Sequence, residues 1–191
     1  KILTGWNAMV IRALAEAGMF LGRDDYIELA KKSASFLSNS LVGKQNRLMR
    51  MYRNGKGKGK GYLEDYALLI DAFIALYEST LDGEWLSRAK KLADCALEIF
   101  WYKAQKLFYD TGKDHEVLIF KPRDIFDNAI PCGSSVMFES LQRLAVFTGE
   151  QDYLKVVEPS IHKIKDLLNK YPTGFPHWLC GLDLYLSKTK E

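Results

Sequence analysis

Hydrophobic residues follow two different patterns along this chain, and the two patterns alternate. The clearest stretch of the first kind is residues 66–77, where Asp71 is the one charged residue among twelve. Twelve residues are too few to cross a bilayer and too many for an ordinary strand, and the alanine and leucine content favours a helix. A helix that is apolar on every side must be surrounded by protein. We therefore predict a buried helix that ends near Thr80.

About seven helices are predicted in all, and enclosed helices alternate with helices that have one polar face. The enclosed helices are expected at about 6–21, 64–80, 135–148 and after Pro176, with Thr4 as the N-cap of the first. The two-faced helices are expected at about 24–41, 84–100 and 151–171. These carry apolar residues every three or four positions and charged residues between them.

An internal repeat supports this pairing of helices. A leucine in one helix precedes an aromatic residue in the next by 12, 9 and 9 positions, in the pairs Leu14 with Tyr26, Leu76 with Trp85, and Leu144 with Tyr153. Repeated pairs with an enclosed first member predict a double ring of helices, that is, an all-α partial α/α toroid. A helical solenoid is the alternative, but the successive aromatic residues lie farther apart than the usual solenoid periods. Three and a half helix pairs leave the ring incomplete.

Two stretches between the helices are expected to be irregular or to form short strands. Residues 47–53 alternate well enough for a strand, and the Gly-Lys repeat at 55–61 is expected to be a mobile loop. This repeat lacks the GxxxxGK[ST] pattern of a phosphate-binding loop. Residues 107–109 and 117–120, separated by a turn, predict a small β-hairpin. The long segments before the third and fifth helices should crowd one end of the ring, where a site can form.

Composition is typical of one soluble globular domain covering 1–191. Hydrophobic residues make up 48% and charged residues 27% of the chain, and the net charge of +3 is scattered, which argues against nucleic-acid binding. No apolar run is long enough to span a membrane. Cys95, Cys132 and Cys180 lie far apart without metal-ligand spacing, which favours reduced thiols in the cytoplasm. Because the chain begins at Lys1 and runs almost directly into an apolar helix, we expect it to be a fragment of a longer protein.

The enclosed helix at 64–80 begins with two carboxylates, Glu64 and Asp65, between Tyr62 and Tyr66. Paired carboxylates can serve as general acid and base at a sugar, and aromatic rings can stack on a pyranose. Alternatively, both carboxylates favour the positive end of the helix or cap its free amides. Adjacent helical residues point about 100° apart, so a second carboxylate from another loop is needed. Asp127 is the better candidate.

Three motifs resemble those of the spermatogenesis-associated, thioredoxin-containing protein family. They are Leu-Thr-Gly-Trp-Asn at 3–7, Gly-Tyr-Leu-Glu-Asp-Tyr-Ala at 61–67, and Asp-Asn-Ala-Ile-Pro at 127–131 followed by Gly133. The family's usual pattern has Ser at the positions of Gly5 and Cys132, and Asn at Ser134. The resemblance implies a six-hairpin glycosidase-like toroid, related to the N-acylglucosamine 2-epimerase group, that follows a thioredoxin-like domain. It also implies carbohydrate-type chemistry.

The candidate site residues follow from the acidic helix start and from this resemblance. Glu64 and Asp127 are expected to be the catalytic pair. Substrate-binding roles are expected for residues at the starts of the enclosed helices, namely Trp6, Asn7, Tyr62, Asp65, Tyr66, His177 and Trp178. Asp71, buried in mid-helix, is expected to be a paired structural carboxylate. Arg50 and Arg53 could meet an anionic sugar or Glu64, and the ion pair with Glu64 is favoured.

No cofactor or metal is expected, because the three histidines are dispersed without ligand spacing. Cys132 precedes a helix start, where a thiolate is stabilised, but no histidine lies near it in sequence. The expected partners are a small sugar, the thioredoxin-like domain of the full-length protein, and a second copy that pairs through exposed helix flanks. The competing hypothesis is a non-catalytic scaffold or binding module whose acidic tip holds loops together or docks a partner.

Overall fold

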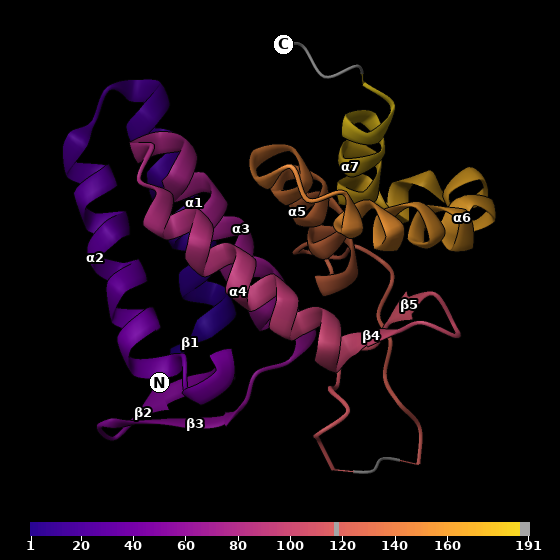
Figure 1. Ribbon diagram of the computed structural model, residues 1–191, viewed down its shortest axis with the longest axis horizontal. Helices are drawn as coiled ribbons and strands as arrows, with labels where there is room; N and C mark the ends of the chain where they lie inside the picture. Colours follow the sequence, from indigo (N-terminus) through magenta and orange to yellow (C-terminus); the bar gives the residue numbers. More distant parts are fainter. Residues whose placement is uncertain (117–118, 188–191) are drawn as a thin grey trace.

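The computed structural model describes residues 1–116 and 119–187, and helices dominate these ranges (Figure 1). The seven α-helices have the following bounds: α1 Thr4–Leu21, α2 Asp24–Leu41, α3 Leu63–Thr80, α4 Gly83–Phe100, α5 Gly133–Thr148, α6 Leu154–Lys170 and α7 Pro176–Leu186. Short 3-10 turns lie at Lys44–Asn46, Gln151–Tyr153 and Pro172–Gly174. Each α-helix lies within a few residues of its predicted position.

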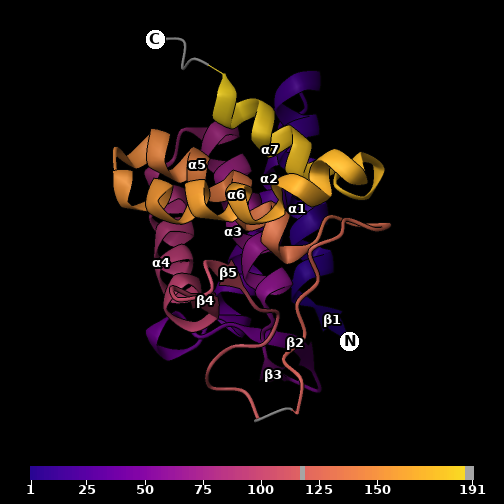
Figure 2. The same ribbon diagram turned by 90° about the vertical axis from the view of Figure 1, so that its right-hand side faces the viewer.

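The helices form two rows, as the alternating pattern predicts. In the inner row α1 packs against α3, α3 against α5, and α5 against α7, while α2, α4 and α6 each pack outside the inner helix that precedes them. Two views at right angles show this arrangement (Figures 1 and 2). The inner helices start at the same end of the molecule because each is followed by an outer helix that returns. The prediction of an all-α partial α/α toroid is therefore confirmed.

The α3 helix is enclosed on all sides. Every residue from Asp65 to Leu76 is buried, because α1 and α5 flank this helix while α4 and α2 cover its outer side. The two ends of the inner row differ from this. On α1, the side chains of Trp6, Val10 and Phe20 are exposed, and in α7 only Trp178 and Gly181 are buried among the helix residues. The prediction that all four inner helices are enclosed is thus wrong for these flanks, since no described helix covers them.

A three-stranded sheet lies beside the starts of α1 and α3. Its strands are β1 Ile2–Leu3, β2 Met49–Arg53 and β3 Lys56–Lys60, in the order β1-β2-β3. The predicted mobile Gly-Lys loop is therefore wrong, because that segment pairs with β2. Asn54 and Gly55 have positive φ angles of 53° and 77°, as a tight two-residue hairpin turn requires. The hydroxyl of Thr4, the predicted N-cap, instead donates to the carbonyl of Met49 at 2.6 Å.

In the small β-hairpin predicted from residues 107–109 and 117–120, the first strand has a different partner from the one expected. β5 (Leu107–Phe108) pairs with β4 (Trp101–Tyr102), which directly follows α4, and the rings of Trp101 and Phe108 pack 4.9 Å apart. Ile119 and Phe120 are exposed and lie outside the strands, while residues 117 and 118 lie outside the described residues. β4 is the favoured partner of β5 because the connection between these two strands is short.

None of the helices in the described ranges has the length and apolar character that a bilayer crossing requires.

Candidate functional site: an acidic pocket at the starts of the inner helices

Asp65 ties the start of α1 to the start of α3. Its Oδ1 accepts a hydrogen bond from the amide of Gly5 at 3.1 Å, and its Oδ2 accepts one from the amide of Tyr62 at 3.0 Å. The residue is 1% exposed, and this burial raises the pKa of its carboxyl group, against the opposing effects of the Tyr62 amide and of Arg50. Asp65 therefore serves as a cap between two helices, which was the alternative to a substrate-binding role.

Asp127 performs the same task for α5 and α7. One carboxylate oxygen accepts hydrogen bonds from the amide of Cys132 at 2.9 Å and from the hydroxyl of Ser135 at 2.6 Å. The other oxygen accepts one from the amide of His177 at 2.9 Å. Because Asp127 is buried and both of its oxygens are occupied in this way, the structure does not support its expected role as the catalytic partner of Glu64.

Gly133 brings the remaining pair, α3 and α5, together. A Cβ atom at this position would lie 2.8 Å from the backbone nitrogen of Glu64, which is closer than real Cβ atoms approach other atoms. Only glycine allows this contact without a shift of one helix. The starts of all four inner helices are consequently tied at one end, by Asp65, Gly133 and Asp127.

A pocket of about 320 Å³ opens at this end, between β2, α3, the 101–132 segment and the start of α5. The following residues line it: Arg50, Tyr62, Glu64, Asp110, Asp124, Phe126, Asn128, Ile130, Pro131, Cys132 and Gly133. Its volume lies at the lower end of the range of small-molecule sites. The long segments before α3 and α5 both contribute to it, as the sequence predicts.

Glu64 is a carboxylate of this pocket that the sequence identified. Its side chain is 40% exposed, and its Oε1 lies 2.5 Å from Nη1 of Arg50, which confirms the expected ion pair. The same nitrogen lies 2.9 Å from Oδ2 of Asp65. The Arg50 guanidinium also lies 4.8 Å from the centre of the Tyr62 ring. Arg50 thus holds the side chain of Glu64 at the pocket wall.

Asp110 and Asp124 are two further carboxylates of the pocket that the sequence analysis missed. The amide of Asp124 donates a hydrogen bond to Oδ2 of Asp110 at 2.7 Å, and the amide of Leu63 donates to the Asp110 carbonyl at 3.0 Å. Burial raises the pKa of Asp110, and the charges of Asp124 and Glu64 raise it further, while the Asp124 amide and Arg123 oppose the shift. No local pattern marks these residues, since both lie in irregular segments outside the helices and strands.

Phe126 and Tyr62 supply the aromatic surface of the pocket. Phe126 is 41% exposed, and it rests on Phe175 with a ring distance of 4.8 Å. Tyr62 is 38% exposed, and its ring stacks on His115 at 5.4 Å and also contacts Arg50. The sequence analysis identified Tyr62 but missed Phe126.

The other expected substrate-binding residues are not among the described residues that line this pocket. Trp6 is 64% exposed on the open flank of α1, and the side chain of Asn7 donates to the carbonyl of Leu3 at 2.7 Å. Tyr66 is fully buried, and its hydroxyl accepts hydrogen bonds from the Leu48 amide and from Arg47. All three lie in the first turn of their helix, but Trp6 points to the open flank of α1, Asn7 binds backbone, and Tyr66 is buried in the core.

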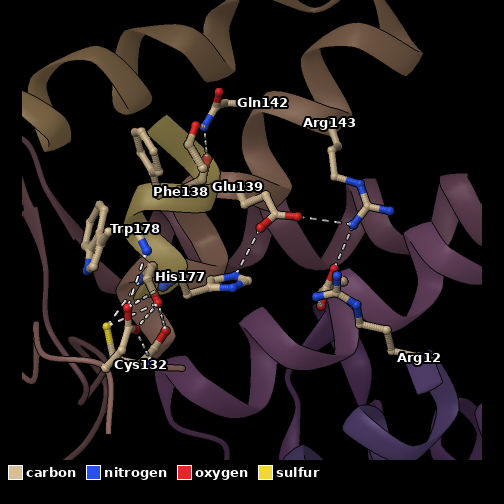
Figure 3. Close-up of polar contacts among 12 residues, drawn as sticks. Arg12, Cys132, Phe138, Glu139, Gln142, Arg143, His177 and Trp178 are labelled. Carbon is tan, nitrogen blue, oxygen red and sulfur yellow. Dashed lines mark hydrogen bonds and ion pairs between the residues drawn. The ribbon is translucent and has the colours of Figure 1, made fainter. Parts of the chain in front are cut away.

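Trp178 and His177 have structural contacts at the start of α7 (Figure 3). Trp178 is 2% exposed, packs on Phe138 at 5.1 Å, and donates from its indole nitrogen to the carbonyl of Ile125 at 3.0 Å. Nε2 of His177 lies 3.2 Å from Oε2 of Glu139 on α5. Both side chains therefore hold α7 against its neighbours.

A row of alternating charges crosses the inner helices (Figure 3). Asp71 on α3 lies 2.6 Å from Arg12 of α1 and 2.8 Å from Arg143 of α5, and Arg143 continues to Glu78 and Glu139. Asp71 is 2% exposed. The expectation that it is a paired structural carboxylate is confirmed.

A thiolate is expected to be stabilised at a helix start, but the surroundings of Cys132 favour the neutral thiol. Burial raises the pKa of its thiol to about 11, although the hydrogen bonds between Cys132 and Ser135 act in the other direction. A thiol with so high a pKa is a poor nucleophile near neutral pH. In the described part of the chain, no group of three or more His, Cys, Asp or Glu side chains is placed to hold a metal ion.

These features define the class: a partial α/α toroid with an acidic, aromatic pocket at the starts of its inner helices. Over its whole length the chain is similar to human spermatogenesis-associated protein 20, at 27% identity over 201 residues. This confirms the resemblance that the three motifs indicate. The chain spans about a quarter (26%) of the length of that relative. No family model matches the chain.

Solved structures share the fold. Cellobiose 2-epimerase from Spirochaeta thermophila aligns with a TM-score of 0.69 at 16% identity, covering 85% of this chain and 43% of that one. An inactive variant of an α-1,6-mannanase from Salegentibacter, in complex with α-1,6-mannotriose, aligns with a TM-score of 0.68 at 17% identity, covering 86% and 47%. At these identities the likeness shows the six-hairpin glycosidase-like fold alone.

Proposed function

We propose that this protein is a carbohydrate-active domain that performs acid–base chemistry in the pocket, with Asp110 as the general acid and Glu64 as the general base. One observation carries the proposal: two carboxylates of a single pocket lie in opposite electrostatic environments. Burial and neighbouring negative charge raise the pKa of Asp110, whereas Glu64 forms an ion pair with Arg50. Pairs of titratable groups whose environments differ in this way mark acid and base roles in enzymes.

Glu64, Asp110 and Phe126 line the same pocket, so a sugar held over Phe126 would lie near both carboxylates. In hydrolysis, the proton on Asp110 would pass to the leaving oxygen while Glu64 takes a proton from the attacking water. In epimerisation, Glu64 would take a proton from a sugar carbon, and Asp110 would return one to the opposite face of the same carbon. The Glu64 carboxylate would keep its contact with Arg50, so that the base is held in position. The same two groups serve hydrolysis and epimerisation, which differ in the atom that supplies the proton.

The comparisons support this class of substrate. One structural neighbour is a cellobiose 2-epimerase, and another is an α-1,6-mannanase that is inactive with two successive aspartates changed to asparagine. This chain also has two successive carboxylates, Glu64 and Asp65, at the start of an inner helix. Here they have separate tasks, since Asp65 caps two helices and Glu64 faces the pocket.

The test is an activity screen on sugars and glycosides with two pocket variants and a matched control. Glu64→Gln and Asp110→Asn remove the base and the acid while keeping side-chain size, and each is expected to lower kcat by about 100-fold or more. Glu158→Gln changes an exposed residue of α6 and should leave the rate unchanged. Turnover that survives in both pocket variants would rule out the assigned roles.

The second candidate function, a non-catalytic scaffold that docks a thioredoxin-like domain or another partner, has one observation in its favour. Asp65 and Asp127, two of the acids at this end, are buried and bind backbone amides. If the pocket is only part of a scaffold, Glu64→Gln should weaken the protein's thermal stability or its binding of that domain. No sugar should then raise the melting temperature of the unmodified protein.

A further inference from the structure

A groove of about 560 Å³ lies between α6 and α7, at the other end of the row of helices from α1 (Figures 1 and 2). Apolar and aromatic side chains from both helices line it, namely Ile161, Leu168, Leu179, Leu182 and Tyr185. Leu179 and Tyr185 are each 38% exposed. The groove and the acidic pocket share none of their described lining residues, so the groove is a separate surface.

The earlier helix pairs show what packs at the equivalent positions. α2 contacts α3, and α4 covers α3 beside it, with side chains of α2 and α4 lining one small pocket. In the same way α4 contacts α5, and α6 covers α5 beside it. Each of these outer helices therefore fills the space between the preceding outer helix and an inner helix. In the described part of the chain, no helix takes that place between α6 and α7.

The rim of the groove on α6 is basic. His162 and Lys165 lie on this rim, and the described lining residues include no acidic side chain. Lys165 is exposed and forms no ion pair with another described residue. At the earlier junction opposite charges meet, since Lys90 of α4 lies 3.3 Å from Glu150, which precedes α6. A helix that packs in the groove would therefore complement it best with acidic residues opposite Lys165.

We infer that this groove binds an amphipathic α-helix from outside these 191 residues, with an apolar stripe against α7 and acidic residues opposite Lys165. This helix would hold the position beside α7 that α4 holds beside α3. The open α1 flank of a second copy does not meet the requirement, because the one acidic residue of α1, Glu16, is paired with Arg12. The inference goes beyond the proposed sugar chemistry and does not depend on it.

The test measures the binding of two labelled peptides by fluorescence polarisation under reducing conditions. One peptide has the sequence of α4, residues 83–100, and the other carries Arg88→Glu and Lys91→Glu, at positions where α4 lines the small pocket shared with α2. The acidic peptide should bind at least about fivefold more tightly. Lys165→Glu in the protein should reverse this preference. Lys163→Glu, an exposed substitution on α6 outside the groove lining, is the matched control and should keep it.

A second variant tests the apolar part of the groove. Leu179→Ser should weaken the binding of the acidic peptide by about tenfold or more, because the helix would bury this side chain. If neither peptide binds, or if Lys165→Glu and Leu179→Ser change nothing, the inference is overturned. If Leu179→Ser abolishes a concentration-dependent rise in the mass of the protein alone, the groove holds a second copy, which also overturns it. The acidic pocket is not altered in any of these variants, so the proposed function stands or fails separately.

Discussion

Arg143 and Asp71 form an ion pair at 2.8 Å between α5 and α3, inside the row of inner helices. Arg12 of α1 approaches the other oxygen of Asp71 at 2.6 Å, so one carboxylate links three helices. A buried charge is tolerated only when it is paired. The contact thus fixes which faces of the three helices meet, in addition to the apolar packing around it.

Removing one partner of Asp71 should destabilise the protein strongly. Arg143→Ala leaves this buried carboxylate with Arg12 alone, and a loss of about 3–5 kcal/mol in the free energy of unfolding is expected from urea denaturation. Arg88→Ala breaks a solvent-exposed pair with Glu84 on α4 and should cost less than about 1 kcal/mol. Equal losses in the free energy of unfolding in the two variants would show that the buried pair of Arg143 and Asp71 stabilises the protein no more than an exposed pair does.

Gly133→Ala should separate the starts of α3 and α5. The added methyl group would lie 2.8 Å from the Glu64 nitrogen, and overpacking of this kind costs about 1–3 kcal/mol. Gly83→Ala at the start of α4 meets nothing within 4 Å and should be neutral or stabilising by about 0.4–1 kcal/mol. Melting temperatures of both variants check the contrast, and a neutral Gly133→Ala would contradict the close helix contact.

The raised pKa of Asp110 predicts a specific dependence of stability on pH. A carboxyl whose folded-state pKa lies above its unfolded value of about 3.9 binds more protons in the folded state, so its contribution to stability falls as pH rises from there through the folded pKa. The fall ends above that folded pKa. In Asp110→Asn this contribution is absent, so the variant should gain stability relative to the unmodified protein as pH rises from about 4. A difference in melting temperature that stays constant with pH would contradict the shift.

Cys132 should resist alkylation. With a thiol pKa of about 11, roughly 0.1% of Cys132 is thiolate at pH 8, and the side chain is also buried. Cys180 is exposed and should be labelled first by iodoacetamide, as measured by peptide mass spectrometry. Labelling of Cys132 as rapid as that of Cys180 would reopen the question of a nucleophilic cysteine in the pocket.

The open flank of α1 predicts self-association. Trp6, Val10 and Phe20 are 64%, 57% and 79% exposed on one helix, and apolar surface of this kind favours pairing. Light scattering should show a mass that rises with protein concentration, and Trp6→Ser should lower it. A constant monomer mass up to high micromolar concentration would contradict the predicted homodimer.

The sequence by itself determined the helices and their order. Hydrophobic periodicity is local, so α2 was located to the residue, and the charge-poor stretch after Glu64 identified α3 as the enclosed helix. The sequence also predicted that Asp71 is paired, because a lone carboxylate in an apolar helix needs a cation. It predicted the contact between Arg50 and Glu64 as well, because Arg50 lies in the segment that precedes α3.

Only the tertiary structure decided what each of the other acids does. Asp127 and Asp65 bind amides of other elements, and Asp110 and Asp124 meet near the start of α3 although both lie in irregular segments. The role of a carboxylate depends on its burial and on the donors around it, and those donors come from segments as far as 60 residues away along the chain, as with Gly5 and Asp65. A sequence pattern does not show which distant residues will be in contact, because the packing of the helices decides these contacts.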